Sequence, residues 1–175
     1  MSEPTLGWRA SGLAWWPLGL IMLALDQFTK EVIQRTLLLH ESVYVLPVLD
    51  ILHTRNTGAA FSFLAQAGGW QRWVFTVFAL AVSVAILISL RRTSGRTQRL
   101  LCAGLMLIAS GAVGNAIDRL RHGYVVDFVA AHWGPAYFPA FNVADACITV
   151  GAGMILLDAL LEWRRERRTG AEHIQ

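Results

Sequence analysis

Two runs of 18 residues without a charged side chain, at 73–90 and 100–117, constrain this chain more than any other feature. Each run is close to the minimum length at which a helix crosses the hydrocarbon layer of a bilayer. The whole sequence of 175 residues is 55% hydrophobic and only 15% charged, which is outside the usual range for a soluble domain of this size. The composition therefore predicts a single integral membrane domain.

Two further apolar stretches, at 13–33 and 142–161, complete a predicted set of four transmembrane helices. The first resembles the core of a secretory signal peptide, but it has no small-x-small cleavage pattern and continues as DQFTKEVI, so we expect an uncleaved span. The polar tail at 164–175 is expected to be cytoplasmic and disordered. The predicted fold class is an all-α membrane protein.

The connection between the first two spans has a different pattern. Its residues at 37–64 include SVYVLPVL and DILHTR, which are rich in β-branched and aromatic side chains and predict a small β-rich element on the outer membrane surface. The second outer connection, at 118–141, is predicted to be a loop. Within it, 130–140 should form a loop or short helix at the interface, whose aromatic residues act as a mobile cover or, in the alternative interpretation, as a static anchor.

Basic residues are distributed unevenly between the two sides of the predicted membrane domain. Nine lie on the side of the two termini, close to the spans, and six lie on the other side. The positive-inside rule therefore places both termini in the cytoplasm. The net charge of +3 is then a signal of topology, and we expect no nucleic-acid partner. The polar residues that this topology brings to the outer face are Asp26, Asn56, Asn115, Asp118, Arg119, Asn142 and Asp145.

The spacing of these polar residues predicts a site. Asn142 and Asp145 are three positions apart, as are Asn115 and Asp118, so each pair shares one face of a helix. Asp127 lies in the strand-like segment GYVVDFV among apolar neighbours. Two carboxylates in a partly dry site cannot both ionise easily, so one keeps a proton. Such a pair can activate a water molecule and protonate a leaving amine, which is peptide hydrolysis without a metal or a nucleophile.

Plainer interpretations exist for several of these residues. Asp118 or Asp127 could pair with Arg119 to secure the loop, and for Asp118 this is the favoured interpretation. His122 and His132 are not at a ligand-like helical spacing, and neither HExxH nor GxSxG with a suitable histidine is present, so we expect no metal. Cys102 and Cys147 lie inside apolar runs and are expected to be packing residues.

Five short motifs carry a resemblance to a known family. They are DQFTK at 26–30, NTGAAF at 56–61, GNAIDR at 114–119, VVDF at 125–128 and FNVAD at 141–145. Each fragment alone is weak evidence, whereas five in order on four spans are specific. The sequence resembles bacterial lipoprotein signal peptidase, also called signal peptidase II, over nearly the whole chain.

This resemblance implies an aspartic-type membrane endopeptidase that cuts a prolipoprotein just before its diacylglyceryl-modified cysteine. The implied catalytic pair is Asp127 and Asp145. The implied substrate-binding or supporting residues are Asn56, Gly58, Asn115, Arg119 and Asn142, with Asp26 and Asp118 supporting the structure. We expect no cofactor, a monomer in contact with membrane lipid, inhibition by globomycin-type peptides, and a place in the bacterial inner membrane with the active site at the outer face.

Two other classes of function remain open from the residues alone. A small proton-coupled transporter also uses membrane carboxylates, but it would favour ionisable groups near the bilayer midplane, whereas here they gather at one edge. A non-catalytic membrane adaptor would not explain the paired carboxylates.

Overall fold

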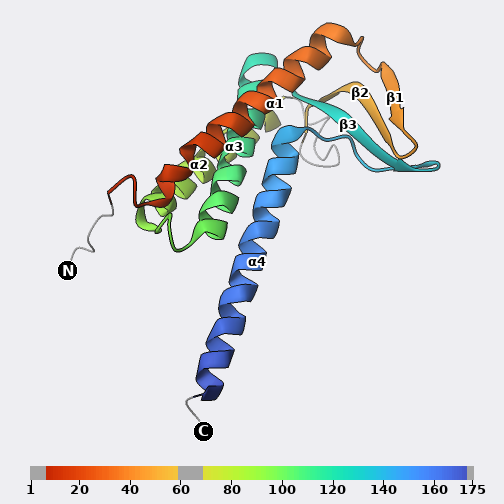
Figure 1. Ribbon diagram of the computed structural model, residues 1–175. Helices are drawn as coiled ribbons and strands as arrows, with labels where there is room; N and C mark the ends of the chain where they lie inside the picture. Colours follow the sequence, from red (N-terminus) through yellow and green to blue (C-terminus); the bar gives the residue numbers. More distant parts are fainter. Residues whose placement is uncertain (1–6, 59–68, 173–175) are drawn as a thin grey trace.

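The computed structural model describes residues 7–58 and 69–172, the last four of these by their backbone alone. Helices pack side by side, a small sheet extends from one end of them, and α4 projects furthest in the opposite direction (Figure 1). The elements are η1 (Gly12–Trp15), α1 (Trp16–Thr36), β1 (Ser42–Leu46), β2 (Leu49–Asn56), α2 (Gln71–Arg92), α3 (Arg99–His122), β3 (Val125–Trp133), β4 (Ala136–Tyr137) and α4 (Val143–Glu172).

Among the described residues, three helices have the length and composition to cross a membrane: α2, α3 and the Val143–Arg168 part of α4. The fold is therefore mostly helical, with apolar helices and a small antiparallel sheet. α1 is also long, with 21 residues, but it carries several charged side chains. The membrane location of the predicted domain is confirmed, whereas the count of four spans stays a prediction.

The ends of the helices differ from the predicted spans, most of all in α3. We ended the third span at 117, before the first charged residue, but α3 continues through His122. Asp118 is only 3% exposed, so its charge lies inside the bundle with polar partners. The helix ends where Gly123 adopts a φ of 83°, a left-handed conformation that glycine accepts without strain.

The far end of α4 also differs from the prediction. We expected a disordered tail from 164, whereas the helix continues through Glu172. The sequence WRRERR consists mainly of arginine and glutamate, which favour helix, so a change from apolar to charged residues does not by itself end the helix.

α3 forms the centre of the bundle because small side chains allow its neighbours to approach. A Cβ atom at Gly104 would lie 2.8 Å from the backbone oxygen of Gly151, and one at Gly111 would collide with the backbone oxygen of Ala144. By contrast, α2 and α4 present large apolar side chains outward, for example Phe78 at 67% and Leu156 at 72% exposure. Outward apolar faces and close small-residue contacts are typical of helices packed in a bilayer.

The sheet joins both predicted outer connections. Its order is β1-β2-β3-β4, and all neighbours are antiparallel. β1 and β2 fall inside the predicted β-rich element at 37–64, of which residues 59–68 lie outside the described residues. The prediction of a sheet confined to the first connection is incomplete, because β3 and β4 come from the second connection.

The connection at 118–141, predicted as a loop with a strand-like segment around Asp127, is therefore largely regular structure, and the strand around Asp127 is confirmed. Residues 125–133 form a strand because their backbone groups pair with β2, whose edge would otherwise lack partners. Gly134, with a φ of 57°, lies in the turn between β3 and β4, so the turn signal was correct but the extent of the loop was not. The mobility predicted for 130–140 stays a prediction.

Candidate active site

A cavity of about 600 Å³ lies where β3, α3 and the first turns of α4 meet. Its wall is mainly apolar, with a few converging polar groups, which is the usual form of a site that binds an organic molecule. The lining residues of this cavity include Asn56, Asn115, Arg119, Asp127, Phe138, Asp145, Ile148 and Val150. The structure thus brings together the two carboxylates that the sequence predicted as a pair.

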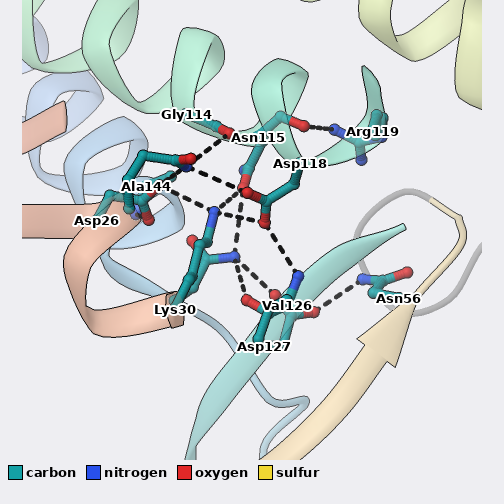
Figure 2. A network of polar contacts seen from close by, with 12 residues as sticks. Asp26, Lys30, Asn56, Gly114, Asn115, Asp118, Arg119, Val126, Asp127 and Ala144 are labelled. Atoms are coloured by element: carbon teal, nitrogen blue, oxygen red, sulfur yellow. Dashed lines mark hydrogen bonds and ion pairs between the residues drawn. The ribbon is translucent and has the colours of Figure 1, made fainter. Parts of the chain in front are cut away.

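Asp127 lies on β3 and is only 2% exposed. Its Oδ1 accepts a hydrogen bond from Asn142 Nδ2 at 2.7 Å, and its Oδ2 accepts one from Asn56 Nδ2 at 3.1 Å (Figure 2). Burial raises the pKa of Asp127 to about 6; the negative charge of Asp145 acts in the same direction, and the two carboxamide hydrogen bonds act against it. The carboxyl group can therefore exchange a proton near neutral pH.

Asp145 lies in the first turn of α4. Its Oδ1 accepts a hydrogen bond from Asn115 Nδ2 at 2.8 Å. Asn142 caps the same helix, because its Oδ1 accepts from the backbone N–H of Asp145 at 2.9 Å, while Asp145 Oδ2 accepts from the backbone N–H of Asn142 at 3.4 Å. This reciprocal arrangement is a capping box, and it holds Asp145 in place at the start of the helix.

Asn142 links the two carboxylates. It is fully buried, and its Nδ2 lies 2.7 Å from Asp127 Oδ1 and 3.3 Å from both Asn115 Oδ1 and the backbone oxygen of Val126. One carboxamide therefore contacts both the strand that carries Asp127 and the helix that carries Asp145. The FNVAD motif makes this possible, because it places the cap and the carboxylate three residues apart.

A second polar group, which we call the ionic cluster, consists of Asp26, Gln27, Lys30 and Asp118. Lys30 Nζ lies 2.9 Å from Asp26 Oδ2 and 3.0 Å from Asp118 Oδ2, and all three side chains are almost completely buried (Figure 2). Gln27 Nε2 donates to both carboxylates at 3.1 Å. Buried charges of this kind are tolerated only when they are paired and hydrogen-bonded.

The ionic cluster also binds backbone groups of neighbouring elements. Asp26 Oδ1 accepts from the backbone N–H of Ala144 at 2.8 Å, in the first turn of α4, and Asp118 Oδ2 accepts from the backbone N–H of Val126 at 3.1 Å, on β3. It therefore connects α1, α3, α4 and β3. These are the elements that carry most of the active site, so the cluster fixes their relative positions.

The expected pairing of Asp118 with Arg119 is wrong. Consecutive residues on a helix point in different directions, and Asp118 turns toward Lys30 instead. Arg119 points to the cavity wall, where its Nη2 donates to the backbone oxygen of Gly58 at 3.1 Å and its Nη1 to that of Asn115 at 3.3 Å. Its guanidinium carbon lies 5.4 Å from the ring centre of Phe75. The alternative pairing of Asp127 with Arg119 is also absent from the described part of the chain.

Sequence reasoning missed Lys30 and Gln27 as members of the site. We used Lys30 only as one of the six basic residues of the outer side and as the last residue of the DQFTK motif, although its spacing of four residues from Asp26 inside an apolar helix was a usable signal. Charges at that spacing lie on one face, and a membrane helix tolerates them when they pair.

The two histidines considered as metal ligands lie apart from the carboxylate pair. His122 stacks on Tyr124, and His132 lies 3.6 Å from Asp50 and stacks on Tyr137. Among residues 7–58 and 69–168, no group of three or more His, Cys, Asp or Glu side chains is placed to hold a metal ion.

The chain is similar to known proteins over most of its length. The sequence model of the family described as signal peptidase (SPase) II matches residues 18–161. The chain is 47% identical over 163 residues to a lipoprotein signal peptidase of Shewanella pealeana, covering 93% of this chain and 95% of the relative. It is 43% identical over 166 residues to a protein of the same description from Shewanella sediminis, covering 95% of this chain and 94% of the relative.

A solved structure is also similar. It is described as a bacterial membrane enzyme, it superposes with a TM-score of 0.75 at 30% sequence identity, and the match covers 85% of this chain and 88% of that one.

Proposed function

The chain belongs to the signal peptidase II family and removes signal peptides from prolipoproteins, and we propose that Asp127 and Asp145 are the catalytic pair of this peptidase. This assignment rests on the shared environment of the two aspartates. Both carboxylates border one cavity, and both are held by asparagine carboxamides. A carboxamide orients a carboxylate without neutralising it, so the pair remains available for proton transfer.

The proposed reaction uses one proton shared across the pair. The ionised carboxylate removes a proton from a water molecule as the water oxygen bonds to the carbonyl carbon of the scissile peptide. The protonated carboxyl group donates a hydrogen bond to the carbonyl oxygen. It then gives its proton to the amide nitrogen as the C–N bond breaks. The products are the carboxylate of the signal peptide and the free amino group of the following residue.

The polar residues around the pair have supporting roles in this proposal. Asn56, Asn115 and Asn142 hold the carboxylates, and Gly58 holds both Asn56, through its N–H, and Arg119, through its carbonyl oxygen. We assign Arg119 to binding a substrate carbonyl, because it borders the cavity with a cationic side chain. Asp26 and Asp118 support the structure through the ionic cluster.

The proposed substrate is a prolipoprotein with a diacylglyceryl-modified cysteine, cut just before that residue. The cavity extends along α4 past Ile148 to Val150, which is 55% exposed on the outward face. An apolar wall that reaches the outside of the bundle suits an acyl chain that enters from the bilayer. The same wall suits an apolar cyclic peptide inhibitor of the globomycin type.

The proposed topology has four spans, with both termini in the cytoplasm and the site at the outer face of the bacterial inner membrane. α1 qualifies as the fourth span because Asp26 and Lys30 pair within the bundle, and Glu31 and Arg35 pair on its exposed side at 2.7 Å. Paired charges near one end of a helix are compatible with insertion. We propose a monomer in contact with membrane lipid.

The transporter and adaptor alternatives are not supported. The relatives are peptidases, and the carboxylates lie at element ends beside the sheet, with Asp127 on β3 and Asp145 in the first turn of α4. The discriminating experiment is incubation of the purified, detergent-solubilised protein with a diacylated prolipoprotein, with and without EDTA. We expect cleavage just before the modified cysteine in both samples. Absence of cleavage without EDTA would contradict the peptidase function, and cleavage abolished by EDTA would contradict the carboxylate mechanism.

A further inference from the structure

Each asparagine that holds the catalytic pair has its carboxamide oxygen bound by a group that can only donate hydrogen bonds. The three contacts are Gly58 N to Asn56 Oδ1 at 3.0 Å, Asp145 N to Asn142 Oδ1 at 2.9 Å, and Lys30 Nζ to Asn115 Oδ1 at 3.0 Å. A carboxamide has one accepting end and one donating end. Because the oxygen is held by a donor in each case, the amino end faces a catalytic carboxylate.

Lys30 differs from the other two donors because it is a side chain. The backbone N–H groups of Gly58 and Asp145 are held by a turn and by a helix cap, whereas Lys30 reaches Asn115 from another helix (Figure 2). An ammonium group has three donors and no acceptor. The three acceptors here are Asp26 Oδ2, Asp118 Oδ2 and Asn115 Oδ1, so the donors of Lys30 are fully used.

The direction of the Asn115 carboxamide matters for Asp145. In the observed orientation, Asn115 Nδ2 donates to Asp145 Oδ1 at 2.8 Å. In the reversed orientation the amide oxygen would face the carboxylate, two acceptors would meet, and Asp145 would lose this donor. Asn142 Nδ2 also donates to Asn115 Oδ1, but at 3.3 Å and while bound to Asp127 at 2.7 Å, so Lys30 provides the stronger constraint.

We propose that Lys30 is a positioning residue for the reaction, an inference that rests on the proposed catalytic pair. Its ammonium group fixes the direction of the Asn115 carboxamide, and that carboxamide then holds Asp145 in the geometry that attacks or protonates the substrate. The ionic cluster therefore acts on catalysis through one defined contact, in addition to joining the helices.

The test compares two double variants that share one net charge. Lys30→Met and Lys30→Gln are each combined with Asp118→Asn, so both double variants keep the net charge of the native cluster. The Asp118→Asn parent, whose cluster is more positive by one charge, is the reference for turnover. Methionine removes every donor, whereas glutamine keeps an amide donor without a positive charge. Turnover of a diacylated prolipoprotein is measured on the purified full chain, and the thermal unfolding curve gives the folded fraction at the assay temperature.

We expect the methionine variant to lose about 10- to 100-fold in kcat against the parent, the effect of losing one hydrogen bond to a charged group. Its KM should stay within about twofold, and glutamine should restore most of the turnover. In the presence of Asn115→Ala, the methionine substitution should cost less than about threefold, because the contact that it breaks is already absent.

Two results would overturn the inference. Equal turnover of the methionine and glutamine variants would show that charge or packing matters rather than the donor. An unchanged cost of Lys30→Met in the presence of Asn115→Ala would show that Lys30 does not act through Asn115. If Asp118→Asn does not yield folded protein, the same comparison is made between Lys30→Met and Lys30→Gln alone, which also share one net charge.

A parallel measurement of Asp145→Asn separates this inference from the proposed function. An active Asp145→Asn variant would reject the catalytic pair, and this inference with it. An inactive Asp145→Asn variant together with full turnover of Lys30→Met/Asp118→Asn would reject only the role of Lys30.

Discussion

Two groups of carboxylates meet at Asn115, and they differ in their partners; Asp127 is as buried as Asp26 and Asp118, whereas Asp145 is half-buried. Asp26 and Asp118 are 1% and 3% exposed, and Asp127 is 2% exposed. The first two share the ammonium group of Lys30. In the described part of the chain, neither Asp127 nor Asp145 has a lysine or arginine nitrogen within 4 Å, and both are held by carboxamides.

The different partners give the two groups different roles: the ionic cluster supports the structure, and the proposed catalytic pair carries out the chemistry. A buried carboxylate paired with a cation has its charge compensated, and removing either partner leaves a buried charge without compensation. A carboxylate held by neutral amides is oriented equally well, but its charge is not cancelled, so taking up or releasing a proton costs less. We therefore expect substitutions in the catalytic pair to lower turnover and substitutions in the ionic cluster to lower stability.

The largest expected effect is on turnover in the catalytic pair. Asp127→Asn and Asp145→Asn keep the shape of the side chain but remove proton transfer, so each should lower kcat by roughly 10² to 10⁴-fold. The measurement is cleavage of a diacylated prolipoprotein by purified variants whose helical content matches the native protein. Either variant with near-native turnover would remove that residue from the pair.

The next effect is on stability in the ionic cluster. Asp26→Ala leaves Lys30 with one partner fewer and the backbone N–H of Ala144 without its acceptor, which should cost about 3–5 kcal/mol. Thermal unfolding in detergent measures this loss. Turnover of the folded fraction should fall much less than in Asp127→Asn. A variant as stable as the native protein would show that the cluster does not hold the helices together.

A third, smaller effect is the pH dependence of stability. The pKa of Asp127 is raised from 3.8 to about 6, so the folded state binds more protons than the unfolded state between these values. The contribution of Asp127 to stability should therefore fall as pH rises from about 4 to 6, by at most roughly 3 kcal/mol. The Asp127→Asn variant should lack this component. Identical pH profiles of unfolding in the two proteins would contradict the raised pKa.

The smallest expected effect concerns Arg119, a cation that belongs to neither group. Arg119→Lys cannot reach the carbonyl oxygens of Gly58 and Asn115 with two separate nitrogens, so substrate should bind less well. We expect KM to rise about 10-fold, the size of one lost hydrogen bond to a charged group, with little change in melting temperature. An unaltered KM would contradict the proposed role of Arg119 in substrate binding.

The sequence alone was sufficient to predict the apolar helices and the family. Uncharged runs can be read without any tertiary contact, and the resemblance based on five motifs is confirmed by the 47% identity to a lipoprotein signal peptidase. The sequence also predicted that Asn142 and Asp145 share one helix face; the structure keeps the two side chains together, but with Asn142 as the cap just before α4.

The remaining features depend on contacts between distant segments. Pairing of β3 with β2 joins Asp127 to Thr54, more than 70 residues earlier, and no local pattern specifies such a partner. The third span was ended before its first charged residue and Asp118 was assigned to Arg119, which shortened α3 and concealed the pairing of Asp118 with Lys30. The roles of the individual site residues stay predictions, because they concern a reaction rather than a fold.

In the proposed mechanism the carboxylate pair activates water and does not attack the substrate itself. A single turnover in water enriched in ¹⁸O, with enzyme in excess over prolipoprotein, distinguishes these two routes. Mass spectrometry then locates the label. We predict one ¹⁸O atom in the new carboxylate of the signal peptide and none in the enzyme peptides that contain Asp127 or Asp145. Label in either aspartate, with unlabelled signal peptide, would show a covalent acyl-enzyme and contradict the account.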